Sequence, residues 1–566
     1  HFDDREEAIA ATKLRPRWPV AQLVDESGGR QIHDGGGTAT RLVIDSRIVA
    51  RGDCYVAIRG DAHDGHTFVG DAIRAGAIAV IVDNEGRGYA PTSTNDTAPA
   101  ATIVVDDTRI GLGRLAHAHR GRWDGKLVAV TGSAGKTTTK ELVRAALGHV
   151  AATHAADGSL NNETGVPLTL LGLRAFHRFA VVEMGMRGLG EIEYLTKLAE
   201  PDVAVVVNAG TAHIERLGST DAIAQAKSEI WLGLRDGGTI VRPVDDDRLA
   251  HWAKTHRPDA RHVTFGDGHG ADVRLVAYTP TDTGGTIDLD IFGEKRSLTL
   301  GLVGRHTAID ACAAIAAAHA AGASIDQALA GVARAKPPAM RGEIVDVAGR
   351  HVIVDCYNAN PASMAAALRA LAERTGAPHR GTTKRGFPAP TAPGVAEPPH
   401  PAGHAIDAAI TSDDSATVTG TIDHEPTKRG IAVPVVVAAR PIADGAPAPR
   451  AARERAATQS GVGVASPGAV ARGIAVVGDM LELGDHAPSA HREIGELARE
   501  LGVGVIALGE FASTVANAAD GEVAADPDAA AARALARTQP GDWILLKASR
   551  GMRLERVLAA MTKARV

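Results

Sequence analysis

The chain has 566 residues, more than one hydrophobic core can organise, and this length predicts three or four domains. Apolar residues make up 45% of the sequence and charged residues 23%, proportions typical of folded globular proteins. The formal net charge is -6 and no long run of lysine or arginine occurs. The composition therefore argues against a nucleic-acid-binding protein.

Cysteine usage and hydropathy favour a protein of the reducing cytoplasm. Cys54, Cys312 and Cys356 lie far apart and form no Cys-x-x-Cys pair, so neither a disulfide framework nor a cysteine zinc site is supported. No apolar run approaches the roughly 20 residues that span a bilayer, and no charged-then-apolar leader is visible. Because the chain begins at His1 and not at a methionine, the natural protein could have a leader segment before it.

Strand and turn patterns divide the chain into α/β segments. Residues 1–106 predict a small α/β domain, because short β-rich runs alternate with glycine and aspartate turns at 42–44, 54–58, 79–82 and 102–105. Residues 107–338 contain apolar strand candidates at 126–131, 180–183, 203–208 and 238–241, each separated from the next by helical patterns. That alternation predicts a central parallel sheet with crossover helices.

Residues 339–566 repeat the rhythm and predict a doubly wound C-terminal domain, with strands at 351–355, 474–477, 505–508 and 543–546. Inside this range, residues 377–471 hold about half of the 28 prolines and are rich in alanine, glycine and threonine. Sequence of this kind cannot form a dense core, so we predict a disordered or loosely folded insertion there.

A strand, a glycine loop and a helix follow one another at residues 126–142, the order that a phosphate-binding loop needs. The loop residues are Gly132, Ser133, Ala134, Gly135, Lys136, Thr137 and Thr138. Its two glycines allow a close backbone approach, and the helix N-terminus attracts an anion. We expect the lysine to reach the β- and γ-phosphates of a nucleotide and the first threonine to bind Mg²⁺. The spacing matches a short Gly-x-x-Gly-Lys-Thr variant, because the strict pattern wants glycine where Val130 stands.

Two further polar positions follow predicted strands of the central sheet. Glu183 ends a buried strand, where a parallel sheet commonly places a Mg²⁺ ligand, although a solvated acid is an equal alternative. Asn208 and His213 follow the next strand. A lone histidine such as His213 is more often structural than a ligand.

Taken jointly, these motifs resemble the Mur ligase family. The similar segments keep one order along the chain and are residues 131–138, 161–169, 183–185, 208–213, 226–230, 340–343, 355–364, 478–484 and 547–552. The most specific is 355–364, which reads Asp-Cys-Tyr-Asn-Ala-Asn-Pro-Ala-Ser-Met.

The resemblance implies three domains: one at 1–106 for the UDP end of a precursor, an ATP-binding one at 107–338, and a Rossmann-like one at 339–566. Within the family it is strongest to the ligase that joins D-alanyl-D-alanine to UDP-N-acetylmuramoyl-tripeptide through an acyl phosphate. We therefore expect ATP and Mg²⁺ as cofactors, these two compounds as substrates, a cytoplasmic location and a monomer. No nucleic acid or membrane insertion is expected.

The resemblance also implies residue roles. Lys136, Lys227 and His213 would be catalytic, and Thr137, Glu183, His213 and Lys227 would hold metal ions, with Lys227 carbamylated. Such a lysine must lie where its ammonium form is disfavoured; a helix-surface lysine is the alternative.

Beside the phosphate loop, nucleotide contacts would come from Arg341, Asp355, Tyr357 and Asn358. Substrate contacts would come from Ser46, Arg47, Asn161, Asn162, Thr164 and Asn360. For Asn360 a hydrogen-bonded turn is the alternative, and for Ser46 and Arg47 it is an ordinary turn with a surface pair.

Two positions depart from the family pattern, because Thr307 and Asp310 stand where asparagines are more common. Adenine contacts from this segment are therefore in doubt. Three rival functions stay open: a ligase for a single amino acid, either another Mur enzyme or a folylpolyglutamate synthase; a P-loop switch or regulatory ATPase; and a binding protein that has lost activity. The sequence does not distinguish diaminopimelate from lysine in the acceptor peptide.

Overall fold

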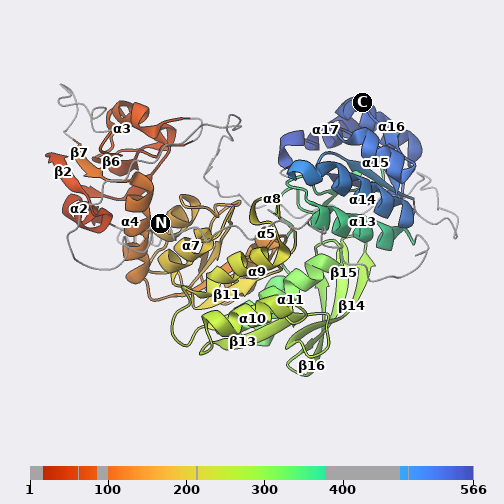
Figure 1. Ribbon diagram of the computed structural model, residues 1–566, viewed down its shortest axis with the longest axis horizontal. Coiled ribbons are helices and arrows are strands. Elements are labelled where there is room, and N and C mark those ends of the chain that lie inside the picture. Colours follow the sequence, from red (N-terminus) through yellow and green to blue (C-terminus); the bar gives the residue numbers. More distant parts are fainter. Residues whose placement is uncertain are drawn as a thin grey trace, which may run out of the picture.

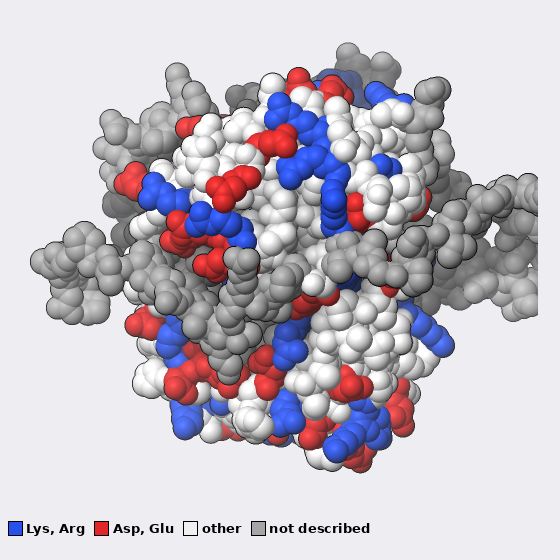
Figure 2. Space-filling model, turned by 90° about the vertical axis from the view of Figure 1, so that its right-hand side faces the viewer, with Lys and Arg blue, Asp and Glu red and all other residues white. Residues whose placement is uncertain are grey.

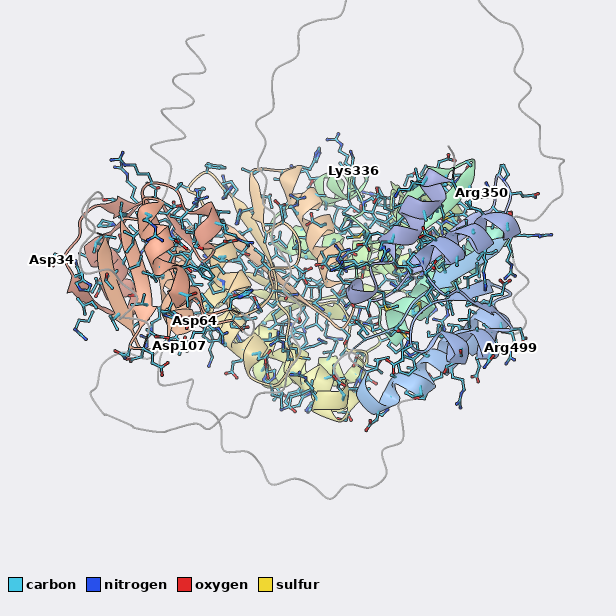
Figure 3. The ribbon with its side chains drawn as sticks, turned by 90° about the horizontal axis from the view of Figure 1, so that it is seen from above. Asp34, Asp64, Asp107, Lys336, Arg350 and Arg499 are labelled. Atoms are coloured by element: carbon cyan, nitrogen blue, oxygen red, sulfur yellow. The ribbon has the colours of Figure 1, made fainter. Side chains whose placement is uncertain are left out.

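The computed structural model describes residues 17–60, 63–85, 100–211, 214–376, 472–481 and 483–564. Three α/β units follow one another in a row, from the N-terminal unit through the central sheet to the C-terminal unit (Figure 1). Figure 3 shows the same row from above, with Asp64 and Asp107 towards one end and Arg350 and Arg499 at the other. The predicted mixed α/β fold with several parallel sheets is confirmed.

The N-terminal unit is built on a five-stranded sheet in the order β2-β7-β6-β5-β4. The four predicted strands are confirmed within a residue or two and pair in parallel, and β2 adds an antiparallel edge. Its elements are β1 (Trp18–Pro19), α2 (Val20–Ser27), β2 (Arg30–His33), β3 (Thr38–Ala39), β4 (Arg41–Val43), η1 (Ser46–Ile48), β5 (Asp53–Val56), η2 (Gly65–Phe68), α3 (Val69–Arg74), β6 (Ala79–Asp83) and β7 (Ala101–Val105).

Helix α4 (Thr108–Gly121) connects the first unit to the second and packs against both. Asp107 caps its N-terminus by accepting hydrogen bonds from the amides of Arg109 and Ile110. One face of α4 contacts α2, and others contact helices α6 and α7 of the central unit. Leu112 and Leu115 belong to a single hydrophobic cluster that also contains Trp18 of the first unit and Leu195 of the second. The first two units therefore share a continuous core.

The central unit contains a nine-stranded sheet in the order β16-β15-β14-β13-β12-β11-β8-β10-β9. The strands from β9 to β14 are parallel, and β14, β15 and β16 form an antiparallel extension. Strand β8 lies inside the sheet, and its residues alternate between two hydrophobic clusters: Leu127 and Ala129 face one, and Val128 and Val130 the other. Burial on both faces explains why this strand is a continuous apolar run.

The strands of this unit are β8 (Lys126–Thr131), β9 (Thr153–Ala155), β10 (Phe179–Glu183), β11 (Val203–Val206), β12 (Thr239–Pro243), β13 (Arg261–Gly266), β14 (Val273–Thr281), β15 (Gly284–Ile291) and β16 (Glu294–Leu300). The helices are α5 (Lys136–Gly148), α6 (Gly165–Leu171), α7 (Glu191–Ala199), α8 (Ile214–Leu217), α9 (Thr220–Ser228), η4 (Glu229–Trp231), α10 (Asp247–His256), α11 (Arg305–Ala320) and α12 (Ile325–Val332). Helix α11 is alanine-rich and almost entirely buried against α5.

The C-terminal unit has a six-stranded sheet in the order β17-β18-β22-β19-β20-β21, parallel except for β17. Its elements are β17 (Glu343–Val347), β18 (Arg350–Val354), α13 (Pro361–Thr375), β19 (Gly473–Val477), η6 (Gly484–His486), α14 (Ala487–Glu500), β20 (Gly504–Ala507), α15 (Ala512–Ala519), β21 (Glu522–Val523), α16 (Pro527–Arg537), β22 (Trp543–Lys547), η7 (Arg550–Met552) and α17 (Glu555–Lys563). All four predicted strands are confirmed. Basic and acidic side chains are interspersed over the face of the molecule in Figure 2.

The predicted insertion at 377–471 lies outside the described residues, and its structure stays a prediction. The elements on its two sides are helix α13 and strand β19. They meet in space, because a Cβ built on Gly473 would lie 3.0 Å from the Thr375 Cγ2. In the described part of the chain, no helix combines the length and the apolar character needed to cross a bilayer.

Candidate functional site

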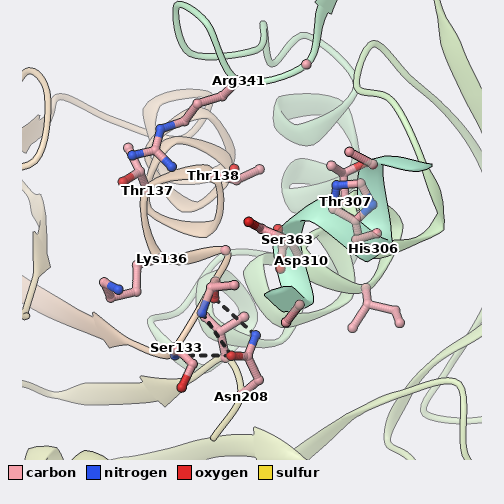
Figure 4. A pocket seen from close by; sticks show the side chains of 18 of the residues that line it. Ser133, Lys136, Thr137, Thr138, Asn208, His306, Thr307, Asp310, Arg341 and Ser363 are labelled. Carbon is pink, nitrogen blue, oxygen red and sulfur yellow. Dashed lines mark hydrogen bonds between the residues drawn. The ribbon is translucent and has the colours of Figure 1, made fainter. Parts of the chain in front are cut away.

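A cavity of about 610 Å³ lies between the central and the C-terminal units. We call its two sides the central wall, which consists of the phosphate loop at 132–138 with Asn161, Glu183 and Asn208, and the C-terminal wall, which consists of Arg341, Asp355, Tyr357, Asn358 and Lys547. Figure 4 shows part of both walls. The volume falls in the range of cavities that bind a nucleotide-sized ligand.

The phosphate loop is folded by the side chain of Asn208, which follows β11. Its Oδ1 accepts hydrogen bonds from the backbone amides of Ser133 and Ala134, at 3.1 and 3.0 Å, and its Nδ2 donates to the Ala134 carbonyl (Figure 4). Gly135 has a φ of 79° at the N-cap of α5, a conformation that favours glycine. A Cβ on Gly132 would lie only 3.0 Å from the Val207 Cβ. Both glycines are therefore required by the loop geometry.

Lys136 begins α5, and its Nζ donates to the Gly132 carbonyl at 2.8 Å. The side chain thus folds back over the loop. Burial lowers the pKa of Lys136, the nearby Glu183 carboxylate raises it, and the Arg341 guanidinium lowers it. A weakly hydrated cation held over the amides at a helix N-terminus is suited to bind phosphate oxygens.

Three predicted residues from separate elements meet beside this lysine. The Thr137 hydroxyl donates to Glu183 Oε2 at 2.8 Å, and Asn161 Nδ2 donates to Glu183 Oε1 at 2.8 Å. Glu183 is 3% exposed. A buried carboxylate beside a hydroxyl, open to a cavity that could hold phosphates, provides the oxygen ligands that Mg²⁺ prefers. These residues therefore fit the predicted metal ion.

Lys227 lies near the end of α9 with only 2% of its surface exposed. Burial lowers its pKa well below the ordinary value, and the charge of Lys136 lowers it further. Within the described ranges, the Lys227 amine donates no hydrogen bond to another residue. The helix-surface alternative is wrong, because the side chain is buried. Its surroundings favour the neutral amine that carbamylation requires.

The C-terminal wall holds its own side chains in place. The guanidinium of Arg341 stacks on the Tyr357 ring at 4.1 Å, and the Tyr357 hydroxyl donates to Ser159 Oγ at 3.5 Å across the cavity. Lys547 Nζ donates to Asp355 Oδ2 at 2.7 Å and to the Asn358 carbonyl at 3.2 Å. The antiparallel hairpin β17–β18 explains why Arg341 and Asp355 lie close together: the Gly342 amide donates to the Val354 carbonyl.

Two predicted substrate residues form side-chain hydrogen bonds at the starts of helices. Asn162 is exposed and accepts hydrogen bonds from the Gly165 amide and the Thr164 hydroxyl at the start of α6. Asn360 lines the cavity and forms a capping box with Ser363 at the start of α13. The turn alternative thus accounts for the hydrogen bonds of Asn360.

Other predicted residues lie elsewhere. Ser46 and Arg47 are in η1 of the N-terminal unit, and Arg47 is exposed and paired with Asp45 at 2.7 Å. They do not line the cavity between the other two units. His213 lies outside the described residues, so its roles as a catalytic residue and metal ligand stay predictions.

Sequence reasoning gave no role to three residues that the structure brings to the site. Lys547 occurs in one of the similar segments, but nothing in a β-strand pattern shows that its amine turns back to Asp355. Ser159 connects the walls, because its hydroxyl also lies 3.2 Å from the Thr137 hydroxyl. Lys140, one turn after Lys136, donates to the carbonyls of Ala156 and Gly158 and so holds the loop that carries Ser159.

The two departures from the family pattern both lie on α11. The Thr307 hydroxyl donates to the Gly304 carbonyl at 2.8 Å, within its own helix. Asp310 is 5% exposed and lines the cavity beside Gly135 of the phosphate loop.

Comparison with known proteins identifies relatives of this arrangement. Three family models match: the Mur ligase family catalytic domain at residues 38–120, the Mur ligase middle domain at 130–318 and the Mur ligase glutamate ligase domain at 438–550. The UDP-N-acetylmuramoyl-tripeptide--D-alanyl-D-alanine ligase of Bacillus subtilis is 35% identical over 329 residues, which cover 58% of this chain and 69% of that protein. The ligase of the same name from Escherichia coli is 32% identical over 372 residues, 63% of this chain and 77% of that protein.

Solved structures agree with the sequence relatives. A crystal structure of MurF from Acinetobacter baumannii superposes with a TM-score of 0.72 at 26% identity, covering 97% of this chain and 99% of that one. MurF from Thermotoga maritima, solved with ADP, has the same fold, with a TM-score of 0.68 at 24% identity and coverage of 93% and 98%. With relatives above 30% identity matched over more than two thirds of their length, this chain belongs to the Mur ligase family.

Proposed function

We propose that this protein is an ATP-dependent ligase that joins D-alanyl-D-alanine to UDP-N-acetylmuramoyl-tripeptide, a step of peptidoglycan precursor synthesis in the cytoplasm. The observation that carries the proposal is the cavity in which a phosphate loop faces Arg341, Tyr357 and Asp355 of another domain. The identity of the two substrates is taken from the names of the B. subtilis and E. coli relatives.

The central wall would bind the triphosphate of ATP. Backbone amides of the loop and the N-terminus of α5 would surround the phosphates, and Lys136 would leave the Gly132 carbonyl for the β- and γ-phosphate oxygens. Thr137 and Glu183 would hold Mg²⁺, together with His213 and a carbamate on Lys227. The metal ion would supply neutralisation of the charge that develops on the transferred phosphoryl group.

A carboxylate is a poor electrophile, and phosphorylation supplies the leaving group that it lacks. An oxygen of the tripeptide carboxylate attacks the γ-phosphorus, the bond to the β-phosphate oxygen breaks, and ADP leaves with that electron pair. The neutral amine of D-alanyl-D-alanine then attacks the carbonyl carbon of the acyl phosphate. The tetrahedral oxyanion collapses to the amide, and inorganic phosphate and a proton are released.

The C-terminal wall would close over the nucleotide. Arg341 would bind phosphate, Asp355 the ribose, and Tyr357 and Asn358 the adenine side or the incoming dipeptide. Contact between Tyr357 and Ser159 brings the two walls together and would help to exclude water, which would otherwise hydrolyse the acyl phosphate.

We assign the other roles by position. Residues 1–106 would bind the UDP end through Ser46 and Arg47, and residues 107–338 would bind ATP. Asn161, Asn162 and Thr164 would form the path of the sugar-peptide toward the γ-phosphate. Residues 339–566 would bring the dipeptide, near Asn360. Asn161 also orients Glu183 through their hydrogen bond.

The test measures inorganic phosphate release with ATP, Mg²⁺ and UDP-N-acetylmuramoyl-tripeptide, with and without D-alanyl-D-alanine. We expect release only when both the tripeptide and the dipeptide are present, with amide product in equal amount. Release that does not depend on the dipeptide would contradict the ligase and favour a regulatory ATPase. Release with a single amino acid in place of the dipeptide would favour another amino-acid ligase. Parallel reactions with diaminopimelate- and lysine-containing tripeptides would identify the acceptor.

A further inference from the structure

Asp310 is a buried acid that no other part of the site uses. It lies on α11, and its carboxylate oxygens are 2.5 and 3.0 Å from the position that a Cβ on Gly135 would occupy. No hydrogen bond joins its carboxyl group to another described residue. Figure 4 shows Asp310 and Lys136 at the same cavity, on different elements. An acid that is 95% buried and unpartnered costs free energy when it is ionised.

The charged groups around Asp310 do little to stabilise its anion. Arg341 of the C-terminal wall is the one group in the described chain whose charge lowers the pKa of this carboxyl. Lys136 follows the neighbouring Gly135, but its amine is turned to the Gly132 carbonyl. His306 lies one turn earlier on α11, and burial lowers its pKa to about 4, so it is neutral near pH 7. The cavity is also lined by Asp245 and Asp267, whose charge is of the wrong sign.

We propose that Asp310 accepts nucleotide only in its protonated form, so that triphosphate binding at the loop takes up a proton from solvent. The inference rests on the proposed ATP site. A triphosphate in the loop would place several negative charges beside the carboxyl group, and like charges at close range in a buried site repel strongly. Protonation removes the repulsion and provides an O–H donor in its place. Asp310 is thus assigned as a binding residue whose charge state sets the affinity for ATP.

The expected pH dependence follows from the direction of the shift. Burial raises the pKa of Asp310 to about 8. The bound triphosphate raises it further, so the complex holds the proton more tightly than the free protein. Affinity is therefore full below about pH 8 and falls as the pH rises above this value, by about tenfold per pH unit until the pKa of the complex is reached.

The first experiment uses the unaltered protein. Isothermal titration calorimetry of ATP with Mg²⁺ at pH 8.5, in buffers of different ionisation enthalpy, measures the protons taken up. We expect an uptake of more than about half a proton per ATP bound, because most free carboxyls are ionised at this pH. Because Lys136 also contributes proton linkage, the decisive comparison is with Asp310→Asn, a neutral side chain of the same shape. Its uptake should be smaller by at least about half a proton.

A second measurement compares dissociation constants for ATP between pH 7 and 9.5. The ratio of the constant of the unaltered protein to that of Asp310→Asn should rise with pH, by about tenfold or more over this range. Asp326→Asn serves as the matched control, because this acid is 86% exposed on α12 and should give a ratio that does not change with pH. Equal proton uptake in the unaltered protein and Asp310→Asn, or a ratio independent of pH, would overturn the inference while leaving the ATP site intact. Failure of ATP to bind at any pH would instead contradict the proposed function itself.

Discussion

The two walls of the cavity are organised differently. On the central wall, Thr137 at the start of α5, Glu183 at the end of β10 and Asn208 after β11 lie at one edge of a single sheet. Thr137 donates to Glu183 at 2.8 Å, and Asn208 accepts from the amides of Ser133 and Ala134 at 3.1 and 3.0 Å. On the C-terminal wall, Arg341 and Asp355 are held within their own domain by Tyr357 and Lys547. A 3.5 Å contact between Tyr357 and Ser159 joins the walls.

This difference indicates a division of tasks. Groups fixed in one sheet keep their geometry without ligand, as stabilisation of a transferring phosphoryl group requires. Groups carried on a separate domain can approach and withdraw as a unit, as substrate entry and product release require. Substitutions in the central wall should therefore change the chemical step and metal binding. Substitutions in the C-terminal wall should change nucleotide affinity and domain closure.

The largest effect is expected for Lys136→Met. Loss of the cation over the phosphate loop should reduce phosphate release by about 1000-fold, because charge on the transferred group is no longer neutralised. Lys140→Met is the matched control on the same helix. Removal of the Lys140 amine takes the charged donor away from two part-buried hydrogen bonds, to the Ala156 and Gly158 carbonyls, so the free energy of unfolding should fall by about 2 kcal/mol. We expect Lys136→Met to lose turnover while its thermal stability stays near normal, and Lys140→Met to lose thermal stability. Equal destabilisation of both variants would contradict it.

Glu183→Gln tests the metal assignment of the central wall. The amide loses the negative charge, so the Mg²⁺ concentration for half-maximal phosphate release should rise by about 10- to 100-fold. Glu294→Gln, an exposed acid on β16, should leave the Mg²⁺ titration unchanged. An unaltered Mg²⁺ requirement in Glu183→Gln would mean that this carboxylate orients Thr137 and Asn161 without binding the metal.

Lys547→Met tests the C-terminal wall. Asp355 would lose its partner, and the unsupported carboxylate should raise the KM for ATP by about tenfold, while kcat changes less. Breaking an ion pair in which one member is 2% exposed should also lower the free energy of unfolding, by about 3 kcal/mol. Lys547→Arg should recover much of the stability. A fall in kcat with an unchanged KM would place Lys547 with the chemistry and so break the proposed division.

The smallest effect is expected for Tyr357→Phe, which removes the bridge between the walls. The hydrogen bond to Ser159 is long and half-exposed, so kcat/KM should fall only about threefold. The ring that stacks on Arg341 is retained. Ser159→Ala should have an effect of similar size, and the double variant should be no worse than either one, as expected for a single shared contact. Additive losses would show that the two hydroxyls act separately.

Much of the fold was predictable because parallel strands buried on both faces form short apolar runs between glycine and aspartate turns. Strand β8 at Lys126–Thr131 was predicted with its observed bounds. The extension β14–β16 was not predicted, since its strands are half-exposed and β15 begins with two glycines, Gly284 and Gly285. The sequence also did not predict that the first two units share one core, because α4 would have the same amphipathic pattern whether it packed against one unit or both.

The candidate site was predictable where chemistry depends on local order. The phosphate loop follows β8 directly and Glu183 ends β10, so their position at one edge of the sheet could be inferred. The roles of Asn208 and Lys547 depend on neighbours 74 and 192 positions away in the chain, which no local pattern reports. Conversely, Asn162 has a motif like that of a ligand residue, but its side chain accepts hydrogen bonds from the Thr164 hydroxyl and the Gly165 amide.

The contact between Thr375 and Gly473 has a consequence for engineering. The chain leaves the C-terminal sheet after α13 and re-enters it at β19 within a few ångströms, so a two- or three-residue turn would suffice to connect them. The junction is therefore a natural graft point. A small domain whose own termini lie close together could be inserted there, and the strand pairing of β19 with β20 and β22 would not need to change.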